Sequence, residues 1–157
     1  MKYVFAALLC ISLSAHAGIL TGKVVRVADG DTLTILDSAQ QQHKIRLSGI
    51  DAPEKAQAFG QRSKQSLSGM VAGKTVSVDW NKRDRYKRIV GKVLLDGRDV
   101  NLEQVRRGMA WHYKAYEREQ DVEDRSVYAQ AEYEAQQGKV GLWVDPKAIP
   151  PWDFRNR

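Results

Sequence analysis

Three acidic side chains and one arginine, spaced over a short stretch, could together hold a phosphate beside a cation. Asp31 follows an Asp-Gly pair, and Arg46 lies in an alternating segment further along. Asp51 and Glu54 flank an Ala-Pro pair. Carboxylate oxygens are ligands for Ca²⁺ or Mg²⁺, and a guanidinium matches a phosphate through paired hydrogen bonds. If turns and a strand bring these groups together, the site suits phosphodiester chemistry.

Some of these residues also have an ordinary structural explanation. Asp-Gly pairs are common hairpin turns, so Asp29 followed by Gly30 needs no function. Glu54 precedes an expected helix, whose first turn tolerates negative charge. Asp31 is harder to explain, because Asp is disfavoured at the start of a strand.

A second charged stretch runs from Asp84 to Arg88. Arg88 is a candidate partner for Arg46, because guanidinium groups bind phosphate oxygens bidentately. Arg85 is a candidate substrate-binding residue. The alternative is a solvated charged turn, the usual explanation of such a run.

Aromatic and histidine side chains offer further candidates. Tyr86, Tyr113 and Tyr116 could stack on bases or contact phosphate, or they could only cover the fold. His43 and His112 would be needed together for a metal-free ribonuclease mechanism with two histidines. Each is more simply explained as a surface or packing residue.

Short alternating segments predict the elements that position these residues. The expected strands cover residues 22–28, 32–36, 43–50, 75–80 and 89–95. The expected helices cover residues 55–71, a short segment from 101, and 121–137, while 140–157 is expected to be extended. This order predicts an α+β, mainly β, fold: a five-stranded OB-type Greek-key barrel with three helices.

Details of the pattern make sharper predictions. Asn101 is expected to cap the short helix, with Gln104 completing a capping box. Val127 is expected on the buried face of the last helix, and Leu67 on that of the first. Gly91 is a candidate bulge within its strand.

Residues 1–17 have the features of a secretory signal peptide. Lys2 supplies a positive start, residues 4–13 are apolar, and Ala15-His16-Ala17 places small residues at a cleavage site. A lipoprotein site at Cys10 is the weaker alternative, because little apolar chain precedes it. We therefore expect export to the periplasm or medium, without a membrane anchor.

The remaining residues, 18–157, are expected to form a single domain. The whole chain has 157 residues, 43% of them hydrophobic, and a formal charge of +6. Such a basic chain favours an acidic partner, although many small basic proteins bind none. Because Cys10 is the only cysteine, disulfides and zinc-thiolate sites are not expected. A monomer with no stable protein partner is the default for so small a domain.

Several motifs, in order and with matching spacing, resemble the staphylococcal nuclease-like family, also called thermonucleases. They include Asp29-Gly30-Asp31-Thr32, Ile50-Asp51-Ala52-Pro53-Glu54, Asp84-Arg85-Tyr86 with Arg88, Arg107-Gly108-Met109-Ala110, and Pro150-Pro151-Trp152. The likeness extends over nearly the whole of residues 18–157. It implies an OB-type barrel and hydrolysis of DNA and RNA that leaves 3′-phosphate products.

The resemblance also implies a role for each residue that matches. The calcium ligands would be Asp31, Asp51 and the main-chain carbonyl of Ala52, and the catalytic residues would be Arg46, Glu54 and Arg88. Glu54 would activate water, and the arginines would stabilise the transition state.

The chain departs from the family at two positions near the site. Ala52 stands where the family often has Thr, a change that keeps a carbonyl ligand. Lys87 stands where the family usually has Gly; if the turn needs a positive φ, Lys87 is strained.

Two other classes of function remain open from the sequence. A non-catalytic nucleic-acid-binding OB module would not need the carboxylates and arginines. A calcium-dependent structural protein would leave the two arginines unexplained.

Overall fold

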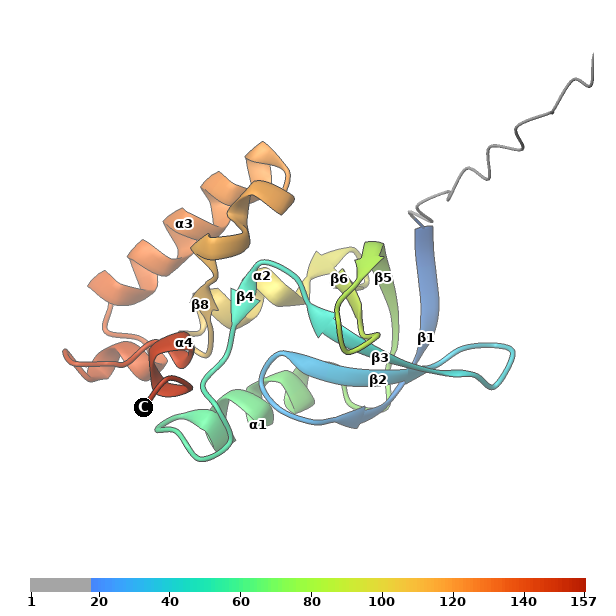
Figure 1. Cartoon of the computed structure of the whole chain (residues 1–157), viewed down its shortest axis with the longest axis horizontal. Helices are drawn as coiled ribbons and strands as arrows, with labels where there is room; N and C mark the ends of the chain where they lie inside the picture. The colour runs from blue at the N-terminus through green and yellow to red at the C-terminus, as the bar shows by residue number, and fades with distance from the viewer. Residues whose placement is uncertain (1–17) are drawn as a thin grey trace, which may run out of the picture.

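Five strands close into a barrel in the computed structural model, which describes residues 18–157 (Figure 1). They are β1 (Gly18–Val27), β2 (Thr32–Leu36), β3 (Gln42–Leu47), β5 (Thr75–Arg83) and β6 (Ile89–Leu95). The hydrogen-bonded order is β3-β2-β1-β5-β6, and a parallel pairing of β3 with β6 closes the ring. The predicted α+β fold with an OB-type barrel is therefore confirmed. The expected signal peptide lies outside the described residues.

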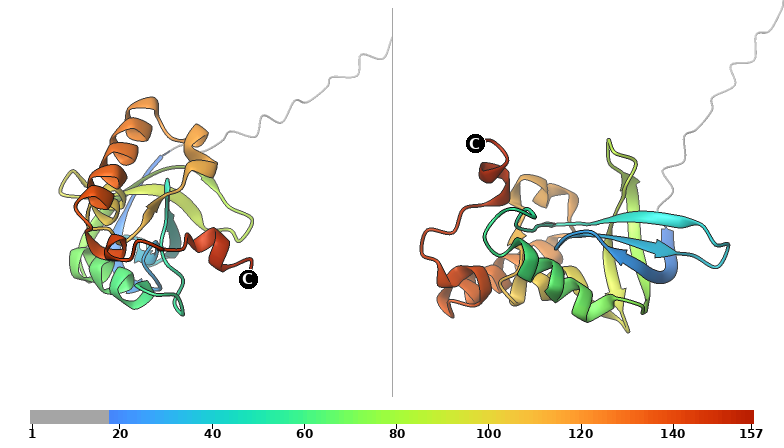
Figure 2. Two further views of the ribbon diagram at one scale, coloured as in Figure 1. Left: turned by 90° about the vertical axis from the view of Figure 1, so that its left-hand side faces the viewer. Right: turned by 90° about the horizontal axis from the view of Figure 1, so that it is seen from below.

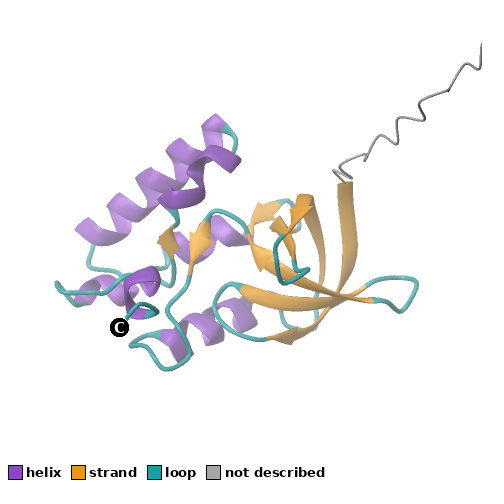
Figure 3. Ribbon diagram, in the orientation of Figure 1, coloured by secondary structure: helices purple, strands orange, loops and turns teal. Residues whose placement is uncertain are grey.

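Most of the helical segments gather at one side of the barrel (Figure 3). The three expected helices are α1 (Gly60–Val71), α2 (Val100–Arg106) and α3 (Val122–Gln137), joined by a short α4 (Pro151–Phe154). Two 3₁₀ helices, η1 (Lys114–Glu119) and η2 (Gly141–Val144), and three short strands, β4 (Ile50–Asp51), β7 (Arg98–Asp99) and β8 (Trp111–His112), complete the fold. Within residues 18–157, no helix is long and apolar enough to cross a membrane.

The C-terminal segment is partly helical, so the prediction of an extended tail was wrong in part. Pro151 is the first residue of α4, a position where proline is tolerated because the first N–H of a helix needs no partner. The segment leads back toward the turn after β4 (Figure 2), where Gln57 Nε2 donates to the Ile149 carbonyl over 2.6 Å.

The alternation of β3 is confirmed by burial. Ile45 and Leu47 are buried in the barrel core, while Arg46 between them is only partly buried. Because successive side chains of a strand point to opposite faces, Arg46 leaves the core and faces the cleft described below. The core also includes Leu67 and Val71 of α1, as predicted.

Helix α1 begins at Gly60, five residues later than the predicted Lys55. The intervening residues form turns, in which Gln57 N donates to Glu54 O and Gly60 N to Gln57 O. Phe59 adopts a left-handed φ of 67° immediately before the helix. Glu54 therefore lies outside the helix, and its explanation as a first-turn helix residue does not hold.

Asn101 lies inside α2 and does not cap it, so that prediction was wrong. The cap is Asp99, whose side chain accepts a hydrogen bond from Leu102 N over 2.9 Å. The Asn101 side chain is fully buried and bonds to barrel backbone: Val93 N at 3.0 Å, Ser48 O at 3.0 Å and Gly91 O at 3.1 Å.

Gln104 is likewise a buried link between α2 and its neighbours, and not part of a capping box. Its Nε2 donates to Gly30 O at 2.8 Å and to Ser63 O at 3.1 Å. A Cβ at Gly30 would lie only 1.8 Å from Ser63 Oγ, so the turn before β2 packs directly on α1.

Two further details differ from prediction. Val127 of α3 is exposed, and its neighbour Tyr128 is buried instead, donating from its hydroxyl to Asp99 Oδ2 over 2.8 Å. The register shift expected at Gly91 lies in the partner strand, between Trp80 and Lys82.

Candidate active site

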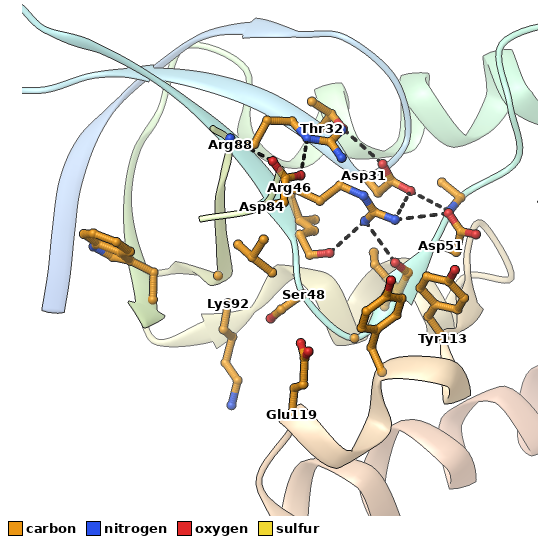
Figure 4. Close-up of a pocket in the computed structure, with 18 of the residues that line it drawn as sticks. Asp31, Thr32, Arg46, Ser48, Asp51, Asp84, Arg88, Lys92, Tyr113 and Glu119 are labelled. Atoms are coloured by element: carbon orange, nitrogen blue, oxygen red, sulfur yellow. Dashed lines mark hydrogen bonds and ion pairs between the residues drawn. The ribbon is translucent and has the colours of Figure 1, made fainter. Parts of the chain in front are cut away.

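A cleft of about 860 Å³ lies between the barrel and the helical part of the chain (Figure 4). All ten residues that the sequence predicted for the site line it. They are Asp31, Arg46, Asp51, Ala52, Glu54, Arg85, Tyr86, Arg88, Tyr113 and Tyr116. The cleft thus collects residues from β2 and β3, the turn after β4, the β5–β6 turn and the segment after β8.

The two turns that carry the carboxylates are tied together by Asp31. Its buried Oδ2 accepts a hydrogen bond from Ala52 N over 2.7 Å. Its Oδ1 accepts from Thr32 Oγ1, and its own N–H donates to Asp29 Oδ1 over 3.1 Å. This network explains why Asp stands at the start of a strand that otherwise disfavours it.

Arg46 lies between the two aspartates and is held by backbone. Its Nη1 donates to the carbonyls of Leu47 at 2.8 Å and Ile50 at 2.9 Å. Its Nη2 lies 3.1 Å from Asp51 Oδ1 and 3.3 Å from Asp31 Oδ2, contacts drawn as dashed lines in Figure 4. Because both Nη atoms are fixed, the guanidinium has one orientation.

Asp51 is only 2% exposed, and β4 places it by pairing with β8. Burial raises the pKa of Asp51, and the hydrogen bond from Arg155 and the charge of Arg46 act against that rise. At the edge of the same network, burial and the neighbouring Asp31 charge raise the pKa of Asp29 to about 6. Burial thus disfavours the charged form of these two carboxyl groups, and nearby arginines oppose that effect.

Arg88 is held differently, by an ion pair within its own turn. Its Nε donates to Asp84 Oδ2 over 2.7 Å, and Asp84 Oδ1 accepts from the Arg88 N–H. Burial favours a higher pKa for Asp84, but the hydrogen bonds and charge of Arg88 outweigh it and lower the pKa. Lys87, which precedes Arg88, has a φ of 63°, so the turn does require the conformation that favours glycine.

The tyrosines form two groups along the cleft. Tyr86 is 63% exposed and contacts both arginines of its turn: its hydroxyl accepts from Arg85 Nη2, and Arg88 lies 5.3 Å from its ring centre. Tyr113 packs against Tyr116 with ring centres 5.0 Å apart. Exposed rings beside a charged cleft could stack on bases.

The sequence did not predict one further residue of the site, Arg155. Its Nη1 donates to Glu54 Oε1 over 2.6 Å, and its Nη2 donates to Asp51 Oδ2 over 2.8 Å. These partners lie about a hundred residues earlier in the chain, so no local spacing relates them. The nearby Pro-Pro-Trp motif was the only available signal.

Each of the three predicted carboxylates is paired with a guanidinium group. Asp31 and Asp51 share Arg46, and Asp51 and Glu54 share Arg155. Across residues 18–157, no three His, Cys, Asp or Glu side chains are grouped closely enough to hold a metal ion. The predicted convergence of three carboxylates on one ion is therefore not found in this arrangement.

The chemistry of the donors nevertheless fits a hard cation. Asp31 and Asp51 supply oxygen ligands next to each other, as Ca²⁺ and Mg²⁺ prefer. Among the residues that line the cleft, acidic side chains outnumber basic ones, although the whole chain carries a formal charge of +6. A polyanion would enter such a cleft more readily if a cation offset that excess.

The two candidate histidines, His43 and His112, lie elsewhere. His43 pairs with Asp37 at 2.7 Å at the start of β3, and His112 is buried with its Nε2 2.8 Å from Gln120. Neither is among the described residues that line the cleft, so the geometry gives no support to a two-histidine mechanism.

Comparison with known proteins agrees with this architecture. Residues 44–145 match the family model described as "Staphylococcal nuclease homologue". An "Uncharacterized endonuclease" of Escherichia coli is 43% identical, over 99% of this chain and 98% of its own length. A "Micrococcal nuclease" of Shigella flexneri is 37% identical, over 96% and 88%. An "Uncharacterized endonuclease" of Haemophilus influenzae is 43% identical, over 87% and 74%. On its fold, its site and these matches, the chain belongs to the staphylococcal nuclease family.

Proposed function

We propose that this protein is a calcium-dependent nuclease that hydrolyses phosphodiester bonds of DNA and RNA. The observation that carries the proposal is that Arg46, Glu54 and Arg88 line one cleft with the buried pair Asp31 and Asp51. Family membership and relatives named as nucleases support the same conclusion.

Asp31, Asp51 and the main-chain carbonyl of Ala52 are the residues that would hold Ca²⁺. A bound divalent cation would draw charge from a non-bridging phosphate oxygen and so make the phosphorus more electrophilic. The two aspartates contribute by offering hard oxygens that the fold has already desolvated. Arg46 keeps them close together without a metal, because it interacts with both.

Glu54 is the candidate for acting on the attacking water. It lines the cleft with its side chain 40% exposed, so water can reach it. As a carboxylate it would orient that water, or accept its proton, for in-line attack at phosphorus. The 5′-oxygen would leave and a 3′-phosphate would remain, as the family resemblance implies.

The two arginines would meet the charge that develops on the equatorial oxygens. A guanidinium carries five donors, so Arg46 can contact a phosphate while its Nη atoms keep their protein partners. Arg88 precedes β6, which pairs with the β3 strand that carries Arg46, and it would exchange its Asp84 contact for the phosphate. Donors that are already oriented need no reorganisation during the reaction.

The exposed aromatic side chains of the cleft bear on the range of substrates. Exposed Tyr86 and Tyr116 would contact bases through their ring faces, which any base can accept, so both DNA and RNA are expected as substrates. From the signal-peptide features of residues 1–17, we also propose that the protein is exported to the periplasm or medium, and that it acts as a monomer.

The test is hydrolysis of single-stranded DNA and RNA over a range of Ca²⁺ and Mg²⁺ concentrations, with and without chelator. We expect cleavage that requires Ca²⁺ and products whose 3′ ends are sensitive to phosphatase. Glu54→Gln should lower turnover by roughly 10²- to 10⁴-fold, the usual contribution of such a group, with DNA binding retained.

The matched control is Glu103→Gln, the same change on the surface of α2, where Glu103 pairs with Arg107. It should leave turnover unchanged. A protein that binds DNA equally with and without metal but cleaves nothing would instead be the non-catalytic OB module. Turnover near wild type in Glu54→Gln would remove that residue from the mechanism.

A further inference from the structure

Arg155 forms ion pairs with Asp51 and Glu54, two carboxylates to which the proposed function assigns other roles. Its Nη1 lies 2.6 Å from Glu54 Oε1 and 3.3 Å from Asp51 Oδ1. Its Nη2 lies 2.8 Å from Asp51 Oδ2. One side chain therefore contacts both the proposed metal ligand and the group proposed to act on water.

The position of Arg155 is set by the packing of the C-terminal segment. Trp152 stacks on Tyr113, with ring centres 5.3 Å apart and an interplanar angle of 9°, and also meets Trp111 edge-on at 5.7 Å. Arg155 N donates to Pro151 O over 3.0 Å at the end of α4. The backbone that carries Arg155 is thus fixed beside the cleft.

Both oxygens of Asp51 are already used by guanidinium groups. Oδ1 accepts from Arg46 and from Arg155, and Oδ2 accepts from Arg155. A divalent cation that binds Asp51 therefore competes with an arginine for a carboxylate oxygen, and its charge repels both arginines.

Arg155 is the arginine that can leave. Arg46 is 14% exposed and its Nη1 is held by two main-chain carbonyls. The side chain of Arg155 is 40% exposed, and among residues 18–157 its guanidinium hydrogen-bonds to the carboxylates of Asp51 and Glu54 alone. An arginine has several rotatable bonds, so its head can swing into water while the packed backbone of the tail stays in place.

We propose that Arg155 is a built-in competitor of the divalent cation: it neutralises Asp51 and Glu54 in the metal-free protein and is displaced when the metal binds. Metal binding would then also free Glu54 to act on water, so the two groups become available together. This inference rests on the proposed function, because it takes Asp51 as a metal ligand.

The test is metal binding without nucleic acid, measured by calorimetric titration of the full chain with CaCl₂. Arg155→Gln should bind Ca²⁺ more tightly, on the order of fivefold, the upper range for releasing a partly exposed ion pair. Arg155→Lys should fall between Arg155→Gln and wild type, because a lysine keeps the charge but not the paired geometry.

Arg157→Gln is the matched control, since it removes the same charge two residues further along. Its affinity should equal that of wild type. Thermal unfolding supplies a second measurement: Ca²⁺ should raise the Tm of Arg155→Gln more than that of wild type, because a tighter ligand stabilises more.

The outcomes separate this inference from the proposed function. Equal Ca²⁺ affinity in wild type and Arg155→Gln, or weaker affinity in the variant, would overturn the competition while leaving the calcium site intact. Asp51→Asn should abolish binding in either background. If wild type and Arg155→Gln both fail to bind Ca²⁺, the calcium assignment falls, and the competition with it.

Discussion

The two arginines proposed to bind the phosphate are positioned in contrasting ways. Arg46 rises from a barrel strand and is held by two main-chain carbonyls and two aspartates. Arg88 follows a turn and is held by Asp84, four residues earlier. The fold as a whole orients Arg46, whereas a local ion pair orients Arg88.

This contrast suggests a division of labour within the cleft. Backbone carbonyls cannot move away, so Arg46 is oriented before any substrate arrives, and no free energy is spent on ordering it. Asp84 can release Arg88, because a partly exposed ion pair contributes only about 0–1 kcal/mol. We therefore call the part of the cleft around Arg46 the rigid half, and the part around Arg88 the exchangeable half.

Of the changes that test this comparison, Arg46→Lys should have the largest effect. Arg46→Lys should lower kcat/KM on single-stranded DNA by about 10²- to 10³-fold, as for loss of one preorganised donor in other enzymes. A lysine cannot satisfy both carbonyls and both aspartates with one ammonium group.

The matched comparison is Arg88→Lys, which should lose less activity because its position already depends on an exchangeable contact. Steady-state kinetics and thermal unfolding should be measured on both variants. Equal losses of activity would contradict the distinction between a rigid and an exchangeable half.

An intermediate effect should come from removing a buried side chain that supports the barrel backbone near the rigid half. Asn101→Ala removes the buried amide that bonds to Val93 N, Ser48 O and Gly91 O. We expect the free energy of unfolding to fall by about 2–4 kcal/mol, because the buried Val93 N–H loses its acceptor and the Ser48 and Gly91 carbonyls each lose a donor. Urea denaturation would measure it.

Asn156→Ala is the control for that change, since Asn156 is exposed and its amide bonds to Trp152 O. Its stability should remain within about 0.5 kcal/mol of wild type, as for most surface substitutions. A similar small loss in Asn101→Ala would mean that water replaces the missing amide.

The smallest expected effect concerns the exchangeable half. Lys87→Gly should raise the free energy of unfolding by about 0.5–1 kcal/mol. Glycine removes the strain of the left-handed backbone, and the greater entropy of glycine in the unfolded chain cancels only part of that gain. Activity should change little. Calorimetric Tm values would detect the difference.

Lys139→Gly offers a parallel case outside the cleft, because Lys139 has a φ of 50°. The two variants should gain similar stability if strain alone is involved. A loss of stability in Lys87→Gly alone would show that the lysine side chain supports its turn.

Local pattern was sufficient for much of this protein. Alternation along single strands predicted β2 and β6 with the same bounds as the structure, because a half-buried strand imposes a period of two on its own residues. The two acidic turns led to Asp31, Asp51 and Glu54, and the charged run from 84 to 88 and the tyrosines led to further candidates. The family resemblance then joined them into one set of ten residues, all of which line the cleft.

Tertiary structure alone decided which side chains serve distant partners. Asn101 fits a helix cap locally, yet its amide serves the barrel, where it accepts from Val93 N and donates to Ser48 O and Gly91 O. Arg155 belongs to the site although its carboxylate partners lie about a hundred residues away. Periodicity within one segment cannot encode such pairings, since they depend on which surfaces meet after the chain has folded.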